Sequence, residues 1–155
     1  MQQNIKVINE TKIDARKLQL EITESIFAHD LEGILLKMTQ LKVHGVRLSL
    51  DDFGAGYSSL SYVKKLPLDE LKIDKSFVKE VLSNISAASI TKMVISLAHE
   101  LHISIIAEGL ETLEQRQFFL ENGCLNFQGY LYIKPLPISE FNDFVLANKS
   151  DSPNS

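Results

Sequence analysis

Short strand-like segments alternate with helix-like segments five times along this 155-residue chain. The strand-like segments span residues 18–23, 46–50, 70–73, 103–107 and about 127–133, and they are rich in β-branched and aliphatic residues. Strands that alternate with helices are typical of a parallel sheet with the helices packed outside it. The alternation therefore predicts an α/β fold.

The intervening segments carry helix signals of their own. Residues 31–44 place apolar side chains at a helical period, and residues 86–99 follow the same pattern. The capping residues that we predict are Asp30 and Gly45 for the first helix, Thr112 with Gln115 and Gly123 for a third, and Pro137 for a last helix over 138–148. The polar tail at 149–155 is predicted to be disordered.

Composition limits the function classes. A hydrophobic content of 45% over 155 residues is enough for one domain with one core. A net charge of -4 argues against a broad basic face for polymeric nucleic acid or an anionic membrane. The single Cys124 excludes an intrachain disulfide and suits a small buried residue in a reducing compartment. With no signal peptide and no membrane-length apolar run, we expect a cytoplasmic protein.

Polar side chains collect at the same end of each predicted strand. In chain order these residues are Glu21 and Glu24, Asp51 and Asp52, Lys72 and Asp74, and Glu108 and Glu111, and Gln128 lies within the fifth strand. In a (β/α) barrel the carboxyl ends of the strands converge on one mouth, which carries the active site. Acids at these positions also serve as N-caps or solvated first-turn residues, and for Glu24 and Glu111 both interpretations stay open. For Asp51, Asp52 and Glu108 a convergent site is favoured.

Neighbouring carboxylates such as Asp51 and Asp52 repel each other, so a fold that gathers them supplies a cation or binds a proton. Oxygen ligands without histidine indicate hard cations such as Mg²⁺ or Mn²⁺. Two such ions about 3.5 to 4 Å apart polarise a phosphoryl group and generate hydroxide, and a lysine nearby can hold the water. The pattern is typical of a metal-dependent phosphodiesterase.

Five motifs then resemble the EAL-domain family of cyclic di-GMP phosphodiesterases, in the family's order and from Leu18 to Leu146. They are Leu20–Ser25, Asp51–Leu60, Leu71–Asp74, Ala107–Thr112, and Gln128–Tyr130 with Lys134–Leu136. The resemblance implies a TIM-type (β/α)₈ barrel that uses Mg²⁺ or Mn²⁺ to open cyclic di-GMP to linear pGpG in bacterial signalling. Residues 1–148 would form this EAL-type domain.

The resemblance also implies roles for single residues. Glu21, Asp51, Asp52 and Glu108 would bind the metals, and Lys72 would hold or activate the attacking water. Gln128 would contact water or substrate, and Glu111 would support the catalytic groups. Glu24 would brace the loop from Phe53 to Ser59, which in this family couples the metal site to dimerisation.

The chain also departs from the family pattern. It lacks the Glu-Ala-Leu tripeptide and the asparagine on the next strand, both metal ligands in the family, and Ala55 replaces the usual threonine. We therefore expect about five of the eight βα units of a barrel. Because an open sheet leaves backbone groups unpaired, we expect a second copy or another chain to complete the barrel. Alone, the chain should be inactive or very weak.

Two other motifs are set aside, and two function classes remain. His99 and His102 are three residues apart instead of the four of a zinc helix motif, and Gly54 with Gly56 lacks the rest of a phosphate-binding fingerprint. The first function class is a metal-dependent phosphodiesterase. The alternative is a non-catalytic module of the same fold that binds cyclic di-GMP or a protein partner.

Overall fold

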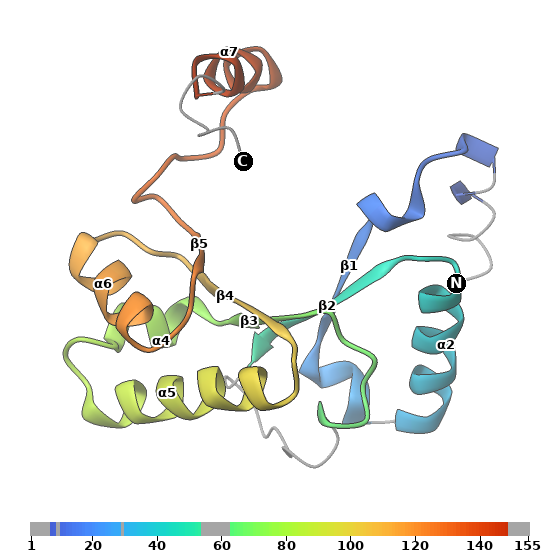
Figure 1. The fold of residues 1–155 in the computed structure, drawn as a ribbon, viewed down its shortest axis with the longest axis horizontal. Helices are drawn as coiled ribbons and strands as arrows, with labels where there is room; N and C mark the ends of the chain where they lie inside the picture. Colours follow the sequence, from blue (N-terminus) through green and yellow to red (C-terminus); the bar gives the residue numbers. More distant parts are fainter. Residues whose placement is uncertain (1–6, 9, 29, 54–62, 149–155) are drawn as a thin grey trace.

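A sheet of five parallel strands forms the centre of the computed structural model, which describes residues 7–8, 10–28, 30–53 and 63–148 (Figure 1). The strands are β1 (Gln19–Thr23), β2 (Arg47–Phe53), β3 (Glu70–Ile73), β4 (Ser104–Glu108) and β5 (Asn126–Gln128). They lie side by side in chain order, and every neighbouring pair is parallel. The predicted α/β fold with a parallel sheet is confirmed.

Helices connect the strands, and their predicted caps form as expected. The helices described are η1 (Ala15–Lys17), η2 (Glu24–Ala28), α2 (Leu31–Val43), α4 (Lys75–Glu80), α5 (Ile85–Glu100), α6 (Leu113–Glu121) and α7 (Ile138–Asn148). The Asp30 side chain accepts a hydrogen bond from the backbone of Gly33 at the start of α2. Thr112 and Gln115 form both hydrogen bonds of the capping box of α6.

The core lies between the sheet and its helices. Leu48, Leu50, Leu71, Ile105 and Ala107 alternate along the three central strands and are almost completely buried. Helices α2 and α5 pack against these strands. Because successive side chains of a strand point to opposite faces, the residues between these apolar ones lie on the other face of the sheet. That face carries the polar residues of the candidate site.

Three local predictions need correction. Strand β2 continues through Asp51 and Asp52 to Phe53, so the acids are part of the strand and do not follow it. The short helix α4 was not predicted, and Asp74 caps it. The last strand ends at Gln128 instead of near residue 133, because the chain turns there with a hydrogen bond from Tyr132 N to Gly129 O.

Helix α7 lies apart from the sheet, at the end of an extended connection (Figure 1). Its apolar side chains Ile138, Phe141 and Leu146 are largely exposed. None of the helices in the described parts of the chain has the length and apolar character needed to cross a membrane. The predicted tail at 149–155 and most of the loop 53–59 lie outside the described residues.

Candidate active site

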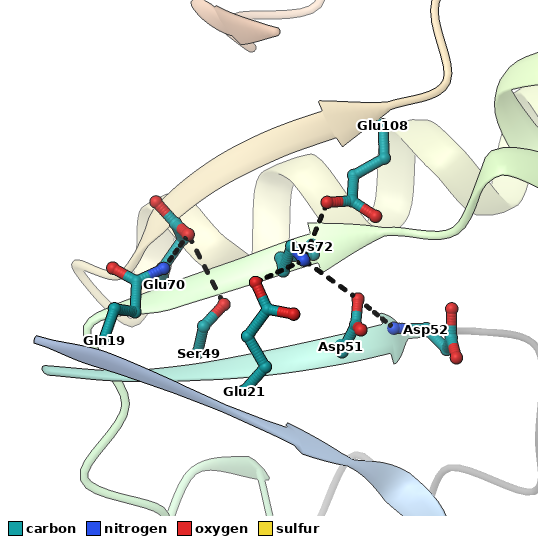
Figure 2. Close-up of polar contacts among 8 residues, drawn as sticks. All are labelled: Gln19, Glu21, Ser49, Asp51, Asp52, Glu70, Lys72 and Glu108. Carbon is teal, nitrogen blue, oxygen red and sulfur yellow. Dashed lines mark hydrogen bonds and ion pairs between the residues drawn. The ribbon is translucent and has the colours of Figure 1, made fainter. Parts of the chain in front are cut away.

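The ammonium group of Lys72 lies at the meeting point of three carboxylates from three other strands (Figure 2). Lys72 Nζ is 2.7 Å from Glu21 Oε1, 2.7 Å from Glu108 Oε1 and 3.3 Å from Asp51 Oδ1. The lysine side chain is 8% exposed, whereas that of Glu21 is 51% exposed. Four residues that the sequence placed in one site therefore meet in space.

Strand register explains the convergence. Residue 51 of β2 lies opposite Thr23 of β1, two residues beyond Glu21, so both acids are on the same face near the same edge. Between β3 and β4, Lys72 lies opposite Ile106, which is two residues before Glu108. Lys72 is on β3, between β2 and β4, which puts its long side chain within reach of acids on both sides. A shift of one residue in any register would turn an acid to the opposite face.

Burial and ion pairing oppose each other in this cluster. Burial lowers the pKa of Lys72, but hydrogen bonds to Glu108 and Glu21 outweigh it and raise the pKa above its ordinary value. For Glu108, burial raises the pKa and the Lys72 ammonium only partly offsets this rise. The three carboxylate oxygens are at most about 6 Å apart, where like charges repel by about 3 kcal/mol at an effective dielectric of 20. The Lys72 ammonium at the centre offsets part of this repulsion.

Asp52 turns away from this cluster. Its backbone has a φ of 54°, in the left-handed region that Asp tolerates better than most residues. Burial, the charge of Asp51 and a hydrogen bond with Asp74 raise the pKa of Asp52. Asp74 also accepts a hydrogen bond from the backbone of Ser76 and caps α4. In this conformation Asp52 does not share the contacts of Asp51 to Lys72.

Beside the cluster is a cavity of about 770 Å³ between α4, the β4–α6 loop and the segment after β5. Glu108, Glu111 and Gln128 line it, so these three predicted site residues are brought together. Gln115 was predicted as a capping residue and not as part of the site. Its side chain accepts from the backbones of Glu111 and Thr112 and donates to Val78 O of α4, which holds the loop after β4. The capping-box pattern was the signal for this contact.

Glu24 is half-buried at the start of η2. The loop that it was predicted to brace lies outside the described residues from 54 onward, so this role stays a prediction. Of the two histidines set aside above, His99 contacts the chain just after α6, with its Nε2 3.2 Å from Gly123 O. Cys124 is buried as predicted, and burial raises the pKa of its thiol to about 11.

The donor atoms of the cluster fit a divalent cation by their chemistry but not yet by their arrangement. Within the described part of the chain, no three acidic, histidine or cysteine groups are already arranged around a metal position, because Lys72 lies between the acids. The chemistry of the donors does fit. Three carboxylate oxygens within 3.3 Å of one cationic nitrogen are hard ligands that already surround a positive charge. The cluster can thus accept Mg²⁺ or Mn²⁺ if the lysine gives way.

Comparison with known families decides the family of this chain. The family model described as the EAL domain matches residues 1–135. The chain belongs to the EAL domain family. Solved EAL domains are barrels of the TIM type, and the five-stranded sheet of this EAL chain corresponds to part of such a barrel.

Several relatives of this EAL chain are cyclic di-GMP enzymes by name. The cyclic di-GMP phosphodiesterase NbdA of Pseudomonas aeruginosa is 40% identical over 135 residues, which are 87% of this chain and 17% of that protein. The bifunctional diguanylate cyclase/cyclic di-GMP phosphodiesterase MucR of the same organism is 41% identical over 128 residues, 83% of this chain and 19% of that protein. The chain thus spans about a fifth of the length of these relatives.

Solved structures show the same relationship. A cyclic di-GMP complex of the PaMucR phosphodiesterase has a TM-score of 0.84 and 38% identity, over 88% of this EAL chain and 56% of that chain. The EAL domain of Mycobacterium smegmatis DcpA has a TM-score of 0.84 and 39% identity, over 92% and 64% of the two chains. A manganese and cyclic di-GMP complex of Klebsiella pneumoniae BlrP1 has a TM-score of 0.76 and 29% identity, over 83% and 33%.

Proposed function

We propose that this chain carries catalytic groups of a metal-dependent cyclic di-GMP phosphodiesterase, which opens the cyclic dinucleotide to linear pGpG in bacterial second-messenger signalling. The observation that carries the proposal is the convergence of Glu21, Asp51 and Glu108 on one cation position. Relatives named as cyclic di-GMP phosphodiesterases support the substrate class. The manganese in the BlrP1 complex supports a divalent metal.

In this proposal each site residue has a separate task. Glu21, Asp51, Asp52 and Glu108 hold Mg²⁺ or Mn²⁺, two ions in a complete site. The bound metal polarises the phosphoryl group and lowers the pKa of water. Lys72 holds the attacking water, and Gln128 contacts water or substrate at the adjoining cavity.

Two further acids act less directly. Glu111, on the same cavity wall, supports these groups, and its loop is fixed by Gln115. Glu24 braces the loop that begins at Phe53 and couples the site to dimerisation. We place the domain in the cytoplasm, where a free buried thiol such as Cys124 is stable.

The chain alone should turn over cyclic di-GMP slowly. Strand β1 pairs only with β2 among the described residues, and Glu21 at this edge is half exposed. No described strand pairs with the other edge of β1. Misplacement of a reacting group by about 1 Å can cost about 100-fold in rate. A second copy or another chain that pairs with β1 would complete the site.

The test uses the purified chain with Mn²⁺ and cyclic di-GMP, binding measured by calorimetry and product by chromatography. We expect Mn²⁺ and the nucleotide to bind, linear pGpG to form slowly, and Asp51→Asn to abolish both metal binding and turnover. Asp143→Asn, an exposed change on α7, is the control and should leave both unchanged. Absence of any binding heat with Mn²⁺ would contradict metal binding by the wild-type chain alone. Rapid turnover by the chain alone would contradict the proposed need for a partner.

A second function is favoured by the Lys72 contacts themselves. Because Lys72 already pairs with the three carboxylates and offsets part of their charge, a domain that binds cyclic di-GMP or a protein partner without metal and without hydrolysis is the second candidate. The same calorimetry in the presence of a chelator separates the two functions. Nucleotide binding that is unchanged by the chelator, with no linear product at any metal concentration, would support the non-catalytic module.

A further inference from the structure

We propose that Lys72 acts as an internal counter-cation that holds Glu21, Asp51 and Glu108 together before metal binds, and that it competes with the metal for them. This inference rests on the proposed metal site and goes beyond the role of Lys72 in holding water. Its basis is that Lys72 Nζ is within 3.3 Å of an oxygen of each acid. The lysine therefore occupies the position that all three ligands surround.

The burial of the cluster makes the lysine necessary for this arrangement. The side chain of Asp51 is 21% exposed and that of Glu108 is 18% exposed, so water screens their mutual repulsion only partly. Among the described residues, the cation that contacts all three acids is Lys72. Without it, Glu21 can swing into solvent from its exposed strand, while the two less exposed acids stay close together. The metal-free cluster is then destabilised by the mutual repulsion of the acids, which a bound metal relieves.

The same contacts set the sign of the effect on metal binding. The metal and the Lys72 ammonium cannot both occupy the position between the three acids. A divalent ion that binds these oxygens must therefore displace at least one lysine contact. Part of the binding free energy is spent on that replacement. Removing the lysine charge should therefore raise metal affinity, although it removes a group that the reaction needs.

The experiment compares Lys72→Met with the wild-type chain at one fixed pH. In chelator, the melting temperature of the variant should fall by a few degrees because the acids lose their counter-cation. Mn²⁺ alone, measured by calorimetry, should bind the variant about fivefold more tightly or better, the factor for losing one modest ion-pair competitor. Mn²⁺ should also raise the melting temperature of the variant by more than that of the wild type.

Two control variants make the result specific. Lys42→Met breaks another ion pair, since Lys42 Nζ is 2.5 Å from Asp69 Oδ1. Neither Lys42 nor Asp69 takes part in the ion pairs between Lys72 and its three acids. It should lower stability and leave Mn²⁺ affinity unchanged. Lys72→Arg keeps the positive charge and should not gain Mn²⁺ affinity.

If Lys72→Met does not fold, the wild-type chain still provides a measurement. The Lys72 ammonium resonance should be observable by nuclear magnetic resonance in the metal-free chain, because the group is buried and hydrogen-bonded. Adding Mg²⁺ should shift or abolish it, whereas the Lys42 resonance should stay. An unchanged Lys72 resonance in a chain that binds Mg²⁺ would overturn the competition.

The failure of this inference differs from the failure of the proposed function. If the wild type binds Mn²⁺ and Lys72→Met binds it no more tightly, the inference is wrong and the metal site stands. If neither protein binds Mn²⁺, the metal site itself is wrong, and the inference falls with it. If only the variant binds, the competition is strong enough to keep metal out of the isolated chain, as the inference requires.

Discussion

Gly129 lies so close to Leu110 that any side chain at position 129 would enter the backbone of residue 110. A Cβ on Gly129 would be 2.2 Å from Leu110 N and 2.3 Å from Leu110 O. The close approach allows two hydrogen bonds, from Leu110 N to Gln128 O and from Leu131 N to Leu110 O. The loops after β4 and β5 are thereby joined beside two site residues, Glu108 and Gln128.

Gly129→Ala should lower the free energy of unfolding by about 1 to 3 kcal/mol, the range for adding a methyl group to a packed site. The neighbour is backbone, which cannot rotate away. Urea denaturation is the measurement. Gly33→Ala is the control, because the nearest atoms to its Cβ belong to the Asp30 carboxylate, which can rotate away at the cost of its N-cap hydrogen bond to Gly33 N. The loss in the free energy of unfolding should be smaller for Gly33→Ala than for Gly129→Ala. Equal stability of Gly129→Ala and wild type would show that the loops can separate without cost.

Gln115→Leu should lower the free energy of unfolding by about 2 to 4 kcal/mol. It leaves the part-buried amides of Glu111 and Thr112 and the buried carbonyl of Val78 without their partner. Thermal or urea denaturation measures the change. Gln117→Leu on the same helix is the control: Gln117 is exposed and bonds only to Glu121, so its effect should stay within about 0.5 kcal/mol. Similar effects of the two changes would contradict the role given to Gln115.

Asp52→Asn should stabilise the metal-free chain by up to about 1 kcal/mol and weaken Mn²⁺ binding. Burial and the charge of Asp51 raise the pKa of Asp52, so its ionised form is unfavourable there, and Asn tolerates a φ of 54° equally well. Denaturation in chelator and calorimetry with Mn²⁺ measure the two effects. Asp143→Asn should change neither quantity. A variant less stable than wild type would mean that Asp52 makes a favourable contact that outweighs the repulsion.

Alkaline pH should destabilise the wild-type chain more than Cys124→Ala. Burial raises the pKa of the folded thiol from 9.0 to about 11, so between these values the unfolded chain loses a proton that the folded chain keeps. The contribution of the thiol is fully present below pH 9 and is lost as pH rises to about 11. Each pKa unit corresponds to about 1.4 kcal/mol. The difference in the free energy of unfolding between wild type and Cys124→Ala should therefore narrow by about 2 to 3 kcal/mol as the pH rises.

Denaturation curves at a series of pH values from 8 upward test this expectation, since all other titrating groups are shared by the two proteins. A constant difference in the free energy of unfolding across that range would mean that the thiol ionises equally in the folded and unfolded chains. The Cys124 thiol, which contacts Asn126 O, would then be more accessible to water than its burial indicates.

Much of the fold could be predicted from local patterns. Asp30, Thr112 and Gln115 cap their helices as expected, because capping needs only a side chain within three residues of a free backbone amide. The four-residue strand at 70–73 was predicted with its bounds. The end of β2 was predicted too early, since acids next to a glycine-rich segment resemble a turn when the neighbouring strand is not seen.

The sequence by itself determined which residues carry charge, which strands deliver them, and that the chain is an EAL domain. Strand period and motif order are local properties and need no partner. Only the tertiary structure decided that Lys72 lies at the centre of Glu21, Asp51 and Glu108, and that Asp52 turns to Asp74. Those contacts depend on the register between strands and on one backbone torsion at Asp52, and neither is encoded in the spacing of residues along the chain.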